Sequence, residues 1–310
     1  MAPPPEREER PGRQTEALTD PPPSKSSVRS LPSKPKAYRL SWPTILAHAA
    51  AIVESYDTGV TLRQLFYRLV VDQTLPNTKS YYQRLSACTA QGRRDGTFPN
   101  LLDKQSHIER YKSFTGPAEA TAWLRDLYRR DRTEGQPWTI FLGVEKAGQS
   151  EQLDAWFTEP LGIPHVALGG YASQSLVDQV RGDVLSQNRP AVFIYAGDHD
   201  PTGEDIDRDF ESRTGCFDKV VRVALHADQL DRFNIPPNAL DPKVEQKLEN
   251  DPRAAAFRSR HGYLDQYEMD ALDANDLRDL YRNAIEDYFD ASAYESAMTA
   301  EAADLEAWSS

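Results

Sequence analysis

Three carboxylates follow apolar runs of the sequence and could together hold a divalent metal ion. Glu145 ends the run Thr139–Val144, while Asp198 and Asp200 follow the run Ala191–Ala196 and precede a Pro-Thr-Gly turn. Both runs have the length and the apolar character of buried strands, which places the carboxylates at strand ends. Carboxylate oxygens are the ligands that Mg²⁺ prefers, and Mn²⁺ is the alternative ion. We therefore expect Glu145, Asp198 and Asp200 to form a magnesium site.

A purely structural interpretation of the same carboxylates stays open. Asp200, which precedes Pro201, has the pattern of a residue that caps a helix with proline in its first turn. Asp198 would then be a solvated loop residue, and Glu145 would pair with Lys146 or cap a helix that begins at Ser150. The metal site is favoured because the carboxyl ends of parallel strands meet at one edge of a sheet.

A tyrosine and an arginine share one face of a predicted helix and could act on a phosphate. In the helix Leu62–Val71, Tyr67 lies roughly 130° from the centre of the apolar stripe. Arg63 lies four residues earlier on the same face, so Tyr67 is expected outside the core with a guanidinium beside it. A tyrosine with a pKa of about 10 must lose its proton to attack, and an arginine and a metal ion would offset the phosphate charge. The alternative is an ordinary surface pair.

Basic residues on the next predicted helix indicate contact with nucleic acid. Lysine and arginine side chains contact phosphates whatever the base sequence, so they predict affinity for DNA without sequence choice. A solvated charged face is the alternative interpretation, and Tyr81 and Tyr82 on this helix are alternative candidates for the nucleophile. The predicted DNA-binding residues are Lys79, Arg84, Arg93 and Arg94, with Lys104, Arg110 and Lys112 in the loop that follows.

The predicted elements place these residues in two domains behind a tail. Residues 1–38 are rich in proline and poor in apolar side chains, which is typical of disorder. Residues 39–132 contain predicted helices at 42–55, 62–71, 79–94 and 117–130, an order expected of a helix-turn-helix or winged-helix domain. Residues 133–310 alternate strands with helices, which predicts an α/β domain with a mostly parallel sheet and helices on both faces. The predicted strands are 139–144, 165–168, 191–196 and 219–225, and the predicted helices are 150–157, 173–185, 204–213 and a last one at 275–289.

Charge is divided unevenly along the chain. The net charge is −12, yet residues 1–135 carry 21 basic and 15 acidic side chains, whereas residues 136–310 carry 15 basic and 33 acidic ones. This division predicts that the first half contacts a polyanion and the second gathers cations, although acidity that only maintains solubility is the alternative.

The remaining sequence signals narrow the class of protein. The two cysteines, Cys88 and Cys216, do not suggest a disulfide framework, and no run is apolar enough for a signal peptide or a membrane span. We expect a cytoplasmic, DNA-associated protein. The sequence contains no Cys/His zinc spacing, no phosphate-binding Gly-Lys-Ser/Thr loop and no dinucleotide fingerprint.

The strand-end motifs resemble the TOPRIM domain of topoisomerases, primases and related nucleases. The form Gly-Asp198-His-Asp200-Pro-Thr-Gly, with Glu145 after the first strand, is most similar to the topoisomerase VI A subunit and its meiotic double-strand-break relatives. Arg63-Gln-Leu-Phe-Tyr67 is similar to the Arg-Asp-x-Tyr-Tyr motif of that family. Gln64 departs from the family aspartate and removes a charge that would orient Arg63 or the nucleophile, whereas Phe66 keeps the aromatic packing. The segment that begins at Glu268 is similar to the Glu-x-Asp-Ala-Leu segment of the same family.

The resemblance implies a type IIB DNA topoisomerase A-like enzyme, close to the short A-like proteins that stand alone. Tyr67, in a CAP-like winged-helix domain, would attack double-stranded DNA, form a 5′-phosphotyrosyl link and release a 3′-hydroxyl. Glu145, Asp198 and Asp200 would hold Mg²⁺, and Arg63 would offset phosphate charge. A homodimer is implied, in which the tyrosine of one subunit meets the metal site of the other, and strand passage would need a separate ATPase subunit. Two alternatives are a hydrolytic TOPRIM nuclease, with Tyr67 a bystander, and a non-catalytic DNA-binding protein.

Overall fold

The computed structural model describes residues 41–102, 111–238 and 242–309. The chain divides into two units, Met1–Ala37 and Tyr38–Ser310, and all described residues belong to the second. The predicted tail at residues 1–38 and the basic residues Lys104 and Arg110 lie outside the described residues. The predicted domain boundary at residue 132 stays a prediction.

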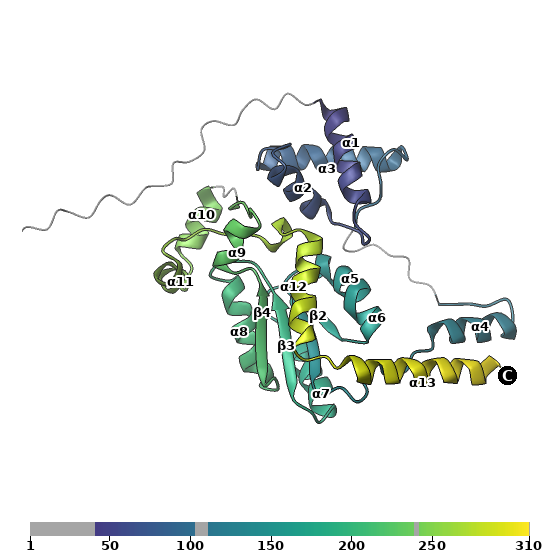
Figure 1. Cartoon of the computed structure of the whole chain (residues 1–310). Coiled ribbons are helices and arrows are strands. Elements are labelled where there is room, and N and C mark those ends of the chain that lie inside the picture. Colours follow the sequence, from purple (N-terminus) through teal and green to yellow (C-terminus); the bar gives the residue numbers. More distant parts are fainter. Residues whose placement is uncertain (1–40, 103–110, 239–241, 310) are drawn as a thin grey trace, which may run out of the picture. The chain divides into compact units, whose positions relative to one another are not determined.

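A four-stranded, all-parallel sheet lies at the centre of the second half of the chain (Figure 1). The strand order is β2-β1-β3-β4, so the chain leaves β1 for β2 on one side and then crosses back to β3 on the other side. This reversal makes a topological switch point between β1 and β3. The prediction of an α/β fold with a parallel sheet is confirmed. The strands are β1 (Thr139–Val144), β2 (His165–Ala167), β3 (Ala191–Ala196) and β4 (Lys219–Ala224).

Helices precede, connect and follow the strands. The predicted last helix corresponds to α12, but it does not end the fold, because α13 follows it; α9, α10 and α11 were not predicted either. The predicted helix 150–157 is a short run of mixed helical turns. In chain order the helices are α1 (Trp42–Glu54), α2 (Leu62–Val71), α3 (Lys79–Arg94), α4 (Pro117–Leu127), η1 (Ala147–Gln149), α5 (Ser150–Leu153), η2 (Asp154–Thr158), α6 (Glu159–Leu161), α7 (Gln174–Ser186), α8 (Gly203–Thr214), α9 (Ala227–Arg232), α10 (Pro242–Glu249), α11 (Ala254–His261), η3 (Met269–Ala271), α12 (Ala274–Glu286) and α13 (Ala291–Ser309).

Alternate side chains of the central strands supply two hydrophobic cores, one on each face of the sheet. Leu142 and Ile194 join a core that includes Tyr281 of α12. Phe141 and Phe193 join the other core, which residues of α7 and α8 complete. Helices therefore cover both faces, as predicted for a parallel sheet, and the two central strands β1 and β3 are buried along their whole length.

A third core joins α1, α2 and α3. Its members include Ile45 of α1, Leu65 and Leu69 of α2 and Leu85 of α3. Helix α2 begins with a capping box, in which the side chains and backbone amides of Thr61 and Gln64 bond reciprocally. The described part of residues 41–130 thus contains the predicted helices, which establishes a helical region but not a winged-helix domain.

None of the helices in the described ranges combines the length and the apolar character that crossing a membrane requires.

Candidate functional site

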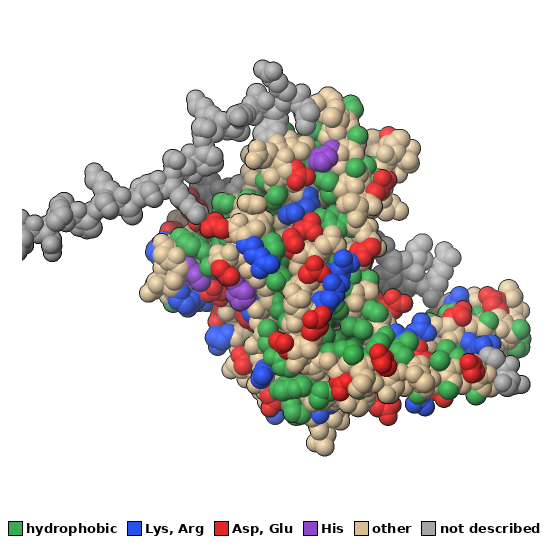
Figure 2. Space-filling model, in the orientation of Figure 1, with side chains coloured by type: hydrophobic (Ala, Val, Ile, Leu, Met, Phe, Trp, Pro, Cys, Tyr) green, Lys and Arg blue, Asp and Glu red, His purple; other side chains and the backbone are tan. Residues whose placement is uncertain are grey.

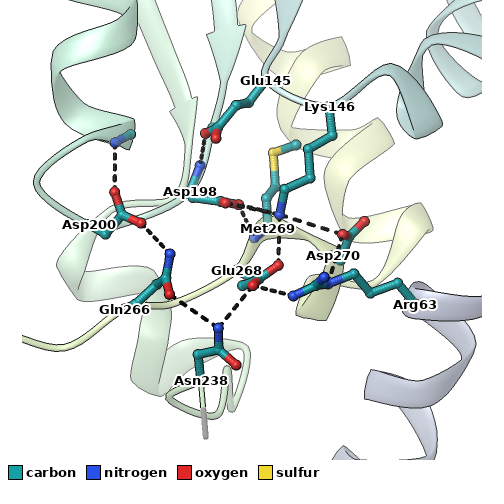
Figure 3. A network of polar contacts seen from close by, with 12 residues as sticks. Arg63, Glu145, Lys146, Asp198, Asp200, Asn238, Gln266, Glu268, Met269 and Asp270 are labelled. Atoms are coloured by element: carbon teal, nitrogen blue, oxygen red, sulfur yellow. Dashed lines mark hydrogen bonds and ion pairs between the residues drawn. The ribbon is translucent and has the colours of Figure 1, made fainter. Parts of the chain in front are cut away.

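The three predicted metal ligands lie at the carboxyl edge of the sheet, at the switch point between β1 and β3 (Figure 3). Glu145 directly follows β1, and its Oε2 accepts a hydrogen bond of 2.8 Å from the backbone amide of Asp198. Asp198 and Asp200 follow β3 and are buried. Open α/β sheets bind their ligands at this position, because the flanking loops diverge there and leave a crevice.

A later segment adds two more buried carboxylates to this edge. Backbone hydrogen bonds in both directions join His199 to Tyr267, and the amide of Met269 donates to Asp198 Oδ1 at 2.8 Å. These bonds hold Glu268 and Asp270, which are 7% and 5% exposed, beside Asp198. We call Glu145, Asp198, Asp200, Glu268 and Asp270 the carboxylate centre.

The ammonium of Lys146 lies inside the carboxylate centre. Its Nζ is 2.9 Å from Asp198 Oδ2, 2.8 Å from Glu268 Oε2 and 3.5 Å from Asp270 Oδ2. Burial alone would lower the pKa of Lys146, but these carboxylates outweigh that effect and raise it above its usual value. The alternative that Glu145 pairs with Lys146 is wrong, because the lysine side chain turns to the other acids.

Asp200 is engaged by the start of α8. Its Oδ1 accepts the amides of Thr202 and Gly203 at 2.9 and 2.7 Å, and its Oδ2 accepts Gln266 Nε2 at 2.6 Å. Burial raises the pKa of Asp200, although these donors favour the charged carboxylate. Gly203 is needed for this turn, because a Cβ there would lie 2.2 Å from the carbonyl oxygen of Asp198. The capping role considered for Asp200 is therefore present in the structure.

The carboxylate centre fits a divalent cation in donor type and charge. Every acidic group in the centre offers oxygen ligands. Burial raises the pKa of Glu145 to about 7, and the negative charge of Asp198 adds to this effect. The oxygens of Glu145, Asp198 and Asp200 do not converge as a metal shell would. Among the described residues, only His199, Glu204 and His261 have ligand atoms that all lie within 4.8 Å of one another. A metal ion bound to Asp198 would have to displace the ammonium of Lys146 from that carboxylate.

Helix α2 brings Arg63 to the carboxylate centre. The guanidinium contacts the carboxylate of Glu268, and its Nε is 3.4 Å from Asp270 Oδ2. The carbon at the centre of the guanidinium also lies 5.9 Å from the centroid of the Tyr67 ring. Arg63 thus links the predicted nucleophile to the acidic edge of the sheet, as Figure 3 shows for its two carboxylate partners.

The prediction that Tyr67 lies outside the core is wrong. Its side chain is 3% exposed and belongs to the core that contains Tyr267 and Met269. The apolar stripe of α2 faces α1 and α3, but the opposite side of the helix packs on the segment after residue 266, which periodicity cannot reveal. Burial, and then the charge of Glu268, raise the pKa of Tyr67 to about 12, while Arg63 opposes this shift. Tyr67 is therefore protonated at neutral pH.

A pocket of about 140 Å³ lies beside the tyrosine helix. Arg63 and Tyr67 line it together with Lys79, one of the residues predicted to contact DNA, and Tyr82, one of the alternative nucleophiles. Two cationic side chains next to a hydroxyl make the pocket suited to an anionic group. The other lining residues are Phe66, Asn77, Thr78 and Asn238.

The other basic residues predicted on α3 do not line this pocket. Arg84 and Arg94 are exposed, whereas Arg93 is half-buried. The guanidinium of Arg84 stacks 4.6 Å from the Trp42 ring, and Arg94 donates to Gln91 Oε1 at 2.7 Å. Figure 2 shows acidic and basic side chains interspersed over the face that it displays. Contact of Arg84, Arg93 and Arg94 with DNA stays a prediction.

Gln64 and Phe66, which lie between Arg63 and Tyr67 in α2, have structural roles. Gln64 is buried, and its Nε2 donates to Gln152 Oε1 at 3.0 Å while its Oε1 accepts the Thr61 amide. It therefore fixes the start of α2, and Glu268 and Asp270 orient Arg63 instead. The ring of Phe66 packs edge-on against Tyr67 and Tyr82, at centroid distances of 5.7 and 5.3 Å.

Sequence reasoning missed three polar members of the site. Lys146 makes ion pairs with three acids of the carboxylate centre, and its place directly after a strand-end glutamate was the available signal. Gln266 bonds to Asp200, and Asn238 bonds to Glu268 Oε1 at 2.9 Å. No signal pointed to these two, since they lie in loops far from the strand ends in sequence.

No protein-family model matches this sequence, and no curated protein matches it.

Proposed function

We propose that this chain cleaves DNA in a Mg²⁺-dependent reaction in which Tyr67 forms a covalent bond to phosphate, as in a topoisomerase VI A subunit. The observation that carries the proposal is the contact of Arg63 with Glu268 and Asp270. It joins the tyrosine helix to a group of buried acids at the switch point of a parallel sheet, where ligands bind. On this proposal α1–α3 belong to a winged-helix domain and the sheet belongs to a TOPRIM domain.

On this proposal the pocket beside Tyr67 binds the DNA phosphate, and the carboxylate centre binds the metal ion. Arg63 and Lys79 hold the phosphate, and Glu145, Asp198 and Asp200 would hold Mg²⁺. Asp200 also fixes the turn that carries Asp198. When bound, the metal ion stabilises negative charge on the phosphate and on the leaving oxygen. The Tyr67 oxygen bonds to phosphorus and the bond to the 3′-oxygen breaks. The proton that Tyr67 loses ends on the 3′-oxygen, so no further reactant is needed.

The buried tyrosine implies that the described arrangement is a resting state. Attack requires the hydroxyl of Tyr67 to meet a DNA phosphate, yet the side chain is 3% exposed and its pKa is about 12. DNA binding must therefore move α2 away from the segment around Met269 and separate Arg63 from its acids. The freed guanidinium then becomes available to the phosphate.

The assembly and location follow the same proposal. One chain already carries the tyrosine helix and the carboxylate centre side by side, and a homodimer would supply two such sets for the two DNA strands. The resemblance to topoisomerase VI A places the tyrosine opposite the other subunit's metal site, so the resting contact within one chain would exchange on DNA binding. Strand passage would use a separate ATPase subunit, and the protein would act on DNA in the cytoplasm.

A second candidate function is hydrolytic cleavage by the same carboxylate centre. The burial and raised pKa of Tyr67 favour it, because a water molecule would attack and the tyrosine would only pack. A covalent-capture assay separates the two. Supercoiled DNA is incubated with protein and Mg²⁺ or Mn²⁺ and quenched with detergent, using wild type, Tyr67→Phe, Asp198→Ala and, as a control in the same pocket, Tyr82→Phe.

The two candidates give different products. The tyrosine mechanism predicts breaks bound to protein that Tyr82→Phe retains and the other two variants lose. Free breaks that survive Tyr67→Phe but not Asp198→Ala would establish hydrolysis instead. Binding without breaks under all conditions would reject both in favour of a DNA-binding protein.

A further inference from the structure

Two histidines and a glutamate converge next to the carboxylate centre but outside it. His199 Nδ1 lies 3.6 Å from Glu204 Oε1, and His261 Nε2 lies 2.7 Å from the same oxygen. One ligand atom from each of the three residues lies within 4.8 Å of the others. The residues come from the turn after β3, the first turn of α8 and the end of α11. We call them the histidine group.

The ring of His199 presents a buried nitrogen without a partner. The residue is 1% exposed, and Nε2 lies 2.9 Å from the hydroxyl of Tyr263. Its Nδ1 has no hydrogen-bond partner within the described ranges of the chain. When Nε2–H donates to Tyr263, Nδ1 carries a lone pair aimed at Glu204 and His261. A buried acceptor that no donor satisfies costs stability, which a bound cation would restore.

We propose that His199, Glu204 and His261 bind one Zn²⁺ ion. Two imidazoles and one carboxylate are a ligand set that zinc takes in proteins, with water in the fourth position. Ligand atoms of a tetrahedral zinc site lie about 3.3 Å apart, given metal–ligand distances of about 2.0–2.1 Å. The His199–Glu204 separation of 3.6 Å already approaches this value. The 2.7 Å His261–Glu204 hydrogen bond would open by a fraction of an ångström as the metal takes the place of its proton.

The surroundings of the histidine group resemble the support that metal ligands need. Arg260 donates to Glu204 Oε2 at 2.6 Å, which leaves Oε1 to the two histidines. Tyr263 orients His199, and the Phe257 ring packs 5.2 Å from His199 and 4.4 Å from His261 between ring centroids. Such outer contacts fix ring orientation and exclude competing water.

The site would act as a structural cross-link. His199 stands between Asp198 and Asp200 in the chain, so a metal bound to its ring would hold the turn that carries both acids. It would also fasten α11 to α8, whose only covalent connection is the long segment between residues 214 and 254. This inference is independent of the proposed DNA cleavage, because it needs only the three ligands.

The test measures metal binding by the untagged full-length chain after chelator treatment. Co²⁺ alone is added first, because its visible absorption reports a tetrahedral nitrogen–oxygen site, and Zn²⁺ is then added to displace it. We expect one equivalent of Co²⁺ to bind, and Zn²⁺ to bleach the spectrum and raise the unfolding temperature. His261→Gln and Glu204→Gln should each weaken binding by at least about 100-fold.

Two controls locate the binding. His48→Gln removes a histidine of α1 that pairs with Asp72, the residue after α2, and should leave binding unchanged. Glu145→Gln removes an acid of the carboxylate centre and should leave the tetrahedral Co²⁺ spectrum of the histidine group unchanged. The proposal is overturned if wild type binds no stoichiometric Co²⁺ or Zn²⁺, if His261→Gln binds as well as His48→Gln, or if Glu145→Gln abolishes binding. Metal binding by the wild-type protein is measured without any variant, so this part of the test holds even if His261→Gln fails to fold.

Discussion

The carboxylate centre and the histidine group share the turn from residue 198 to 200, yet they are completed in different ways. In the carboxylate centre, Lys146 provides a positive charge to three acids, and backbone amides bond to Asp198 and Asp200. In the histidine group, the buried Nδ1 of His199 lacks a partner among the described residues. The first cluster thus already contains a cation, whereas the second leaves a buried ring nitrogen without a partner within the described residues.

This difference bears on how each cluster would respond to metal. A metal ion entering the carboxylate centre must compete with a lysine that makes three ion pairs, so we expect the centre to bind the ion weakly and to release it readily. A cation entering the histidine group meets an unused lone pair and displaces only one proton. We expect a structural metal ion where no protein group satisfies the ligands. We expect a catalytic metal ion where a protein cation can take its place when the ion dissociates.

The largest effect is expected from Asp198→Asn. The change removes the charge that Lys146 contacts at 2.9 Å and weakens the acceptor of the Met269 amide, so we expect a loss of about 3–5 kcal/mol of stability. Cleavage of DNA should disappear as well. Urea unfolding measures the first and the plasmid assay the second. The exposed Asp178→Asn on α7 is the matched control, and equal unfolding curves for the two variants would contradict a structural role for Asp198.

Lys146→Met tests whether a metal ion can take the place of the ammonium. Buried acids would lose their counter-charge, so stability without divalent ions should fall by about 3 kcal/mol. Added Mg²⁺ should recover part of this lost stability. It should stabilise the variant more than wild type, because in the variant the ion no longer competes with the lysine ammonium. Thermal unfolding with and without Mg²⁺ measures both effects. Lys219→Met on the surface of β4 is the control, and an absent Mg²⁺ response in Lys146→Met would argue against a metal at this centre.

Arg63→Gln should have a smaller effect on folding and a large one on cleavage. The Arg63 side chain is 42% exposed, so solvent weakens its pairs with Glu268 and Asp270, and a loss of about 1 kcal/mol is expected. Covalent capture of DNA should fall much further, because the pocket would lose one of its two cations. Arg282→Gln, which changes an exposed arginine of α12 outside that pocket, provides the comparison. Equal capture by the two variants would remove Arg63 from the proposed chemistry.

The sequence predicted the elements that local patterns determine. β1 and β3 have the predicted bounds because each is an unbroken apolar run that ends at polar residues, and α2 and α3 have them because capping residues and turn residues flank each helix. The same logic predicted the positions of Glu145, Asp198 and Asp200 after the ends of these strands. The position of Asp200 at the start of α8 was also readable from the proline and glycine that follow it.

What the sequence could not predict depends on contacts between distant segments. Tyr67 is buried because the chain near Met269 folds back onto α2, some 200 residues later, and no periodicity within α2 encodes this. The histidine group escaped detection for the same reason, since His199 and His261 lie far apart in the chain and show no metal-binding spacing. The helices α9, α10 and α11 have only six to eight residues each, which is too short for a helical repeat of apolar residues to stand out in the sequence.

An ion pair outside both clusters gives a baseline for their predicted effects. Arg132 Nη2 lies 2.7 Å from Glu301 Oε1, and both side chains are largely buried where α13 meets the segment after α4. The hydrogen bond from Arg132 is the main cause of a lowered pKa for Glu301. A depressed pKa means that the pair contributes stability above the unfolded pKa, and that this contribution is lost as the pH falls through the folded value.

Glu301→Gln should therefore cost about 1 kcal/mol at neutral pH and less in acid. In acid the wild-type glutamate is itself protonated, so the variant and wild type should approach the same stability. Urea unfolding of both proteins across a pH series, at constant ionic strength, measures the difference. Unlike the changes in the carboxylate centre, this loss should be insensitive to Mg²⁺ and to Zn²⁺. A difference that grows as the pH falls would contradict the lowered pKa of Glu301. A difference that either metal removes would mean that the two clusters do not differ from an ordinary ion pair in their response to metal.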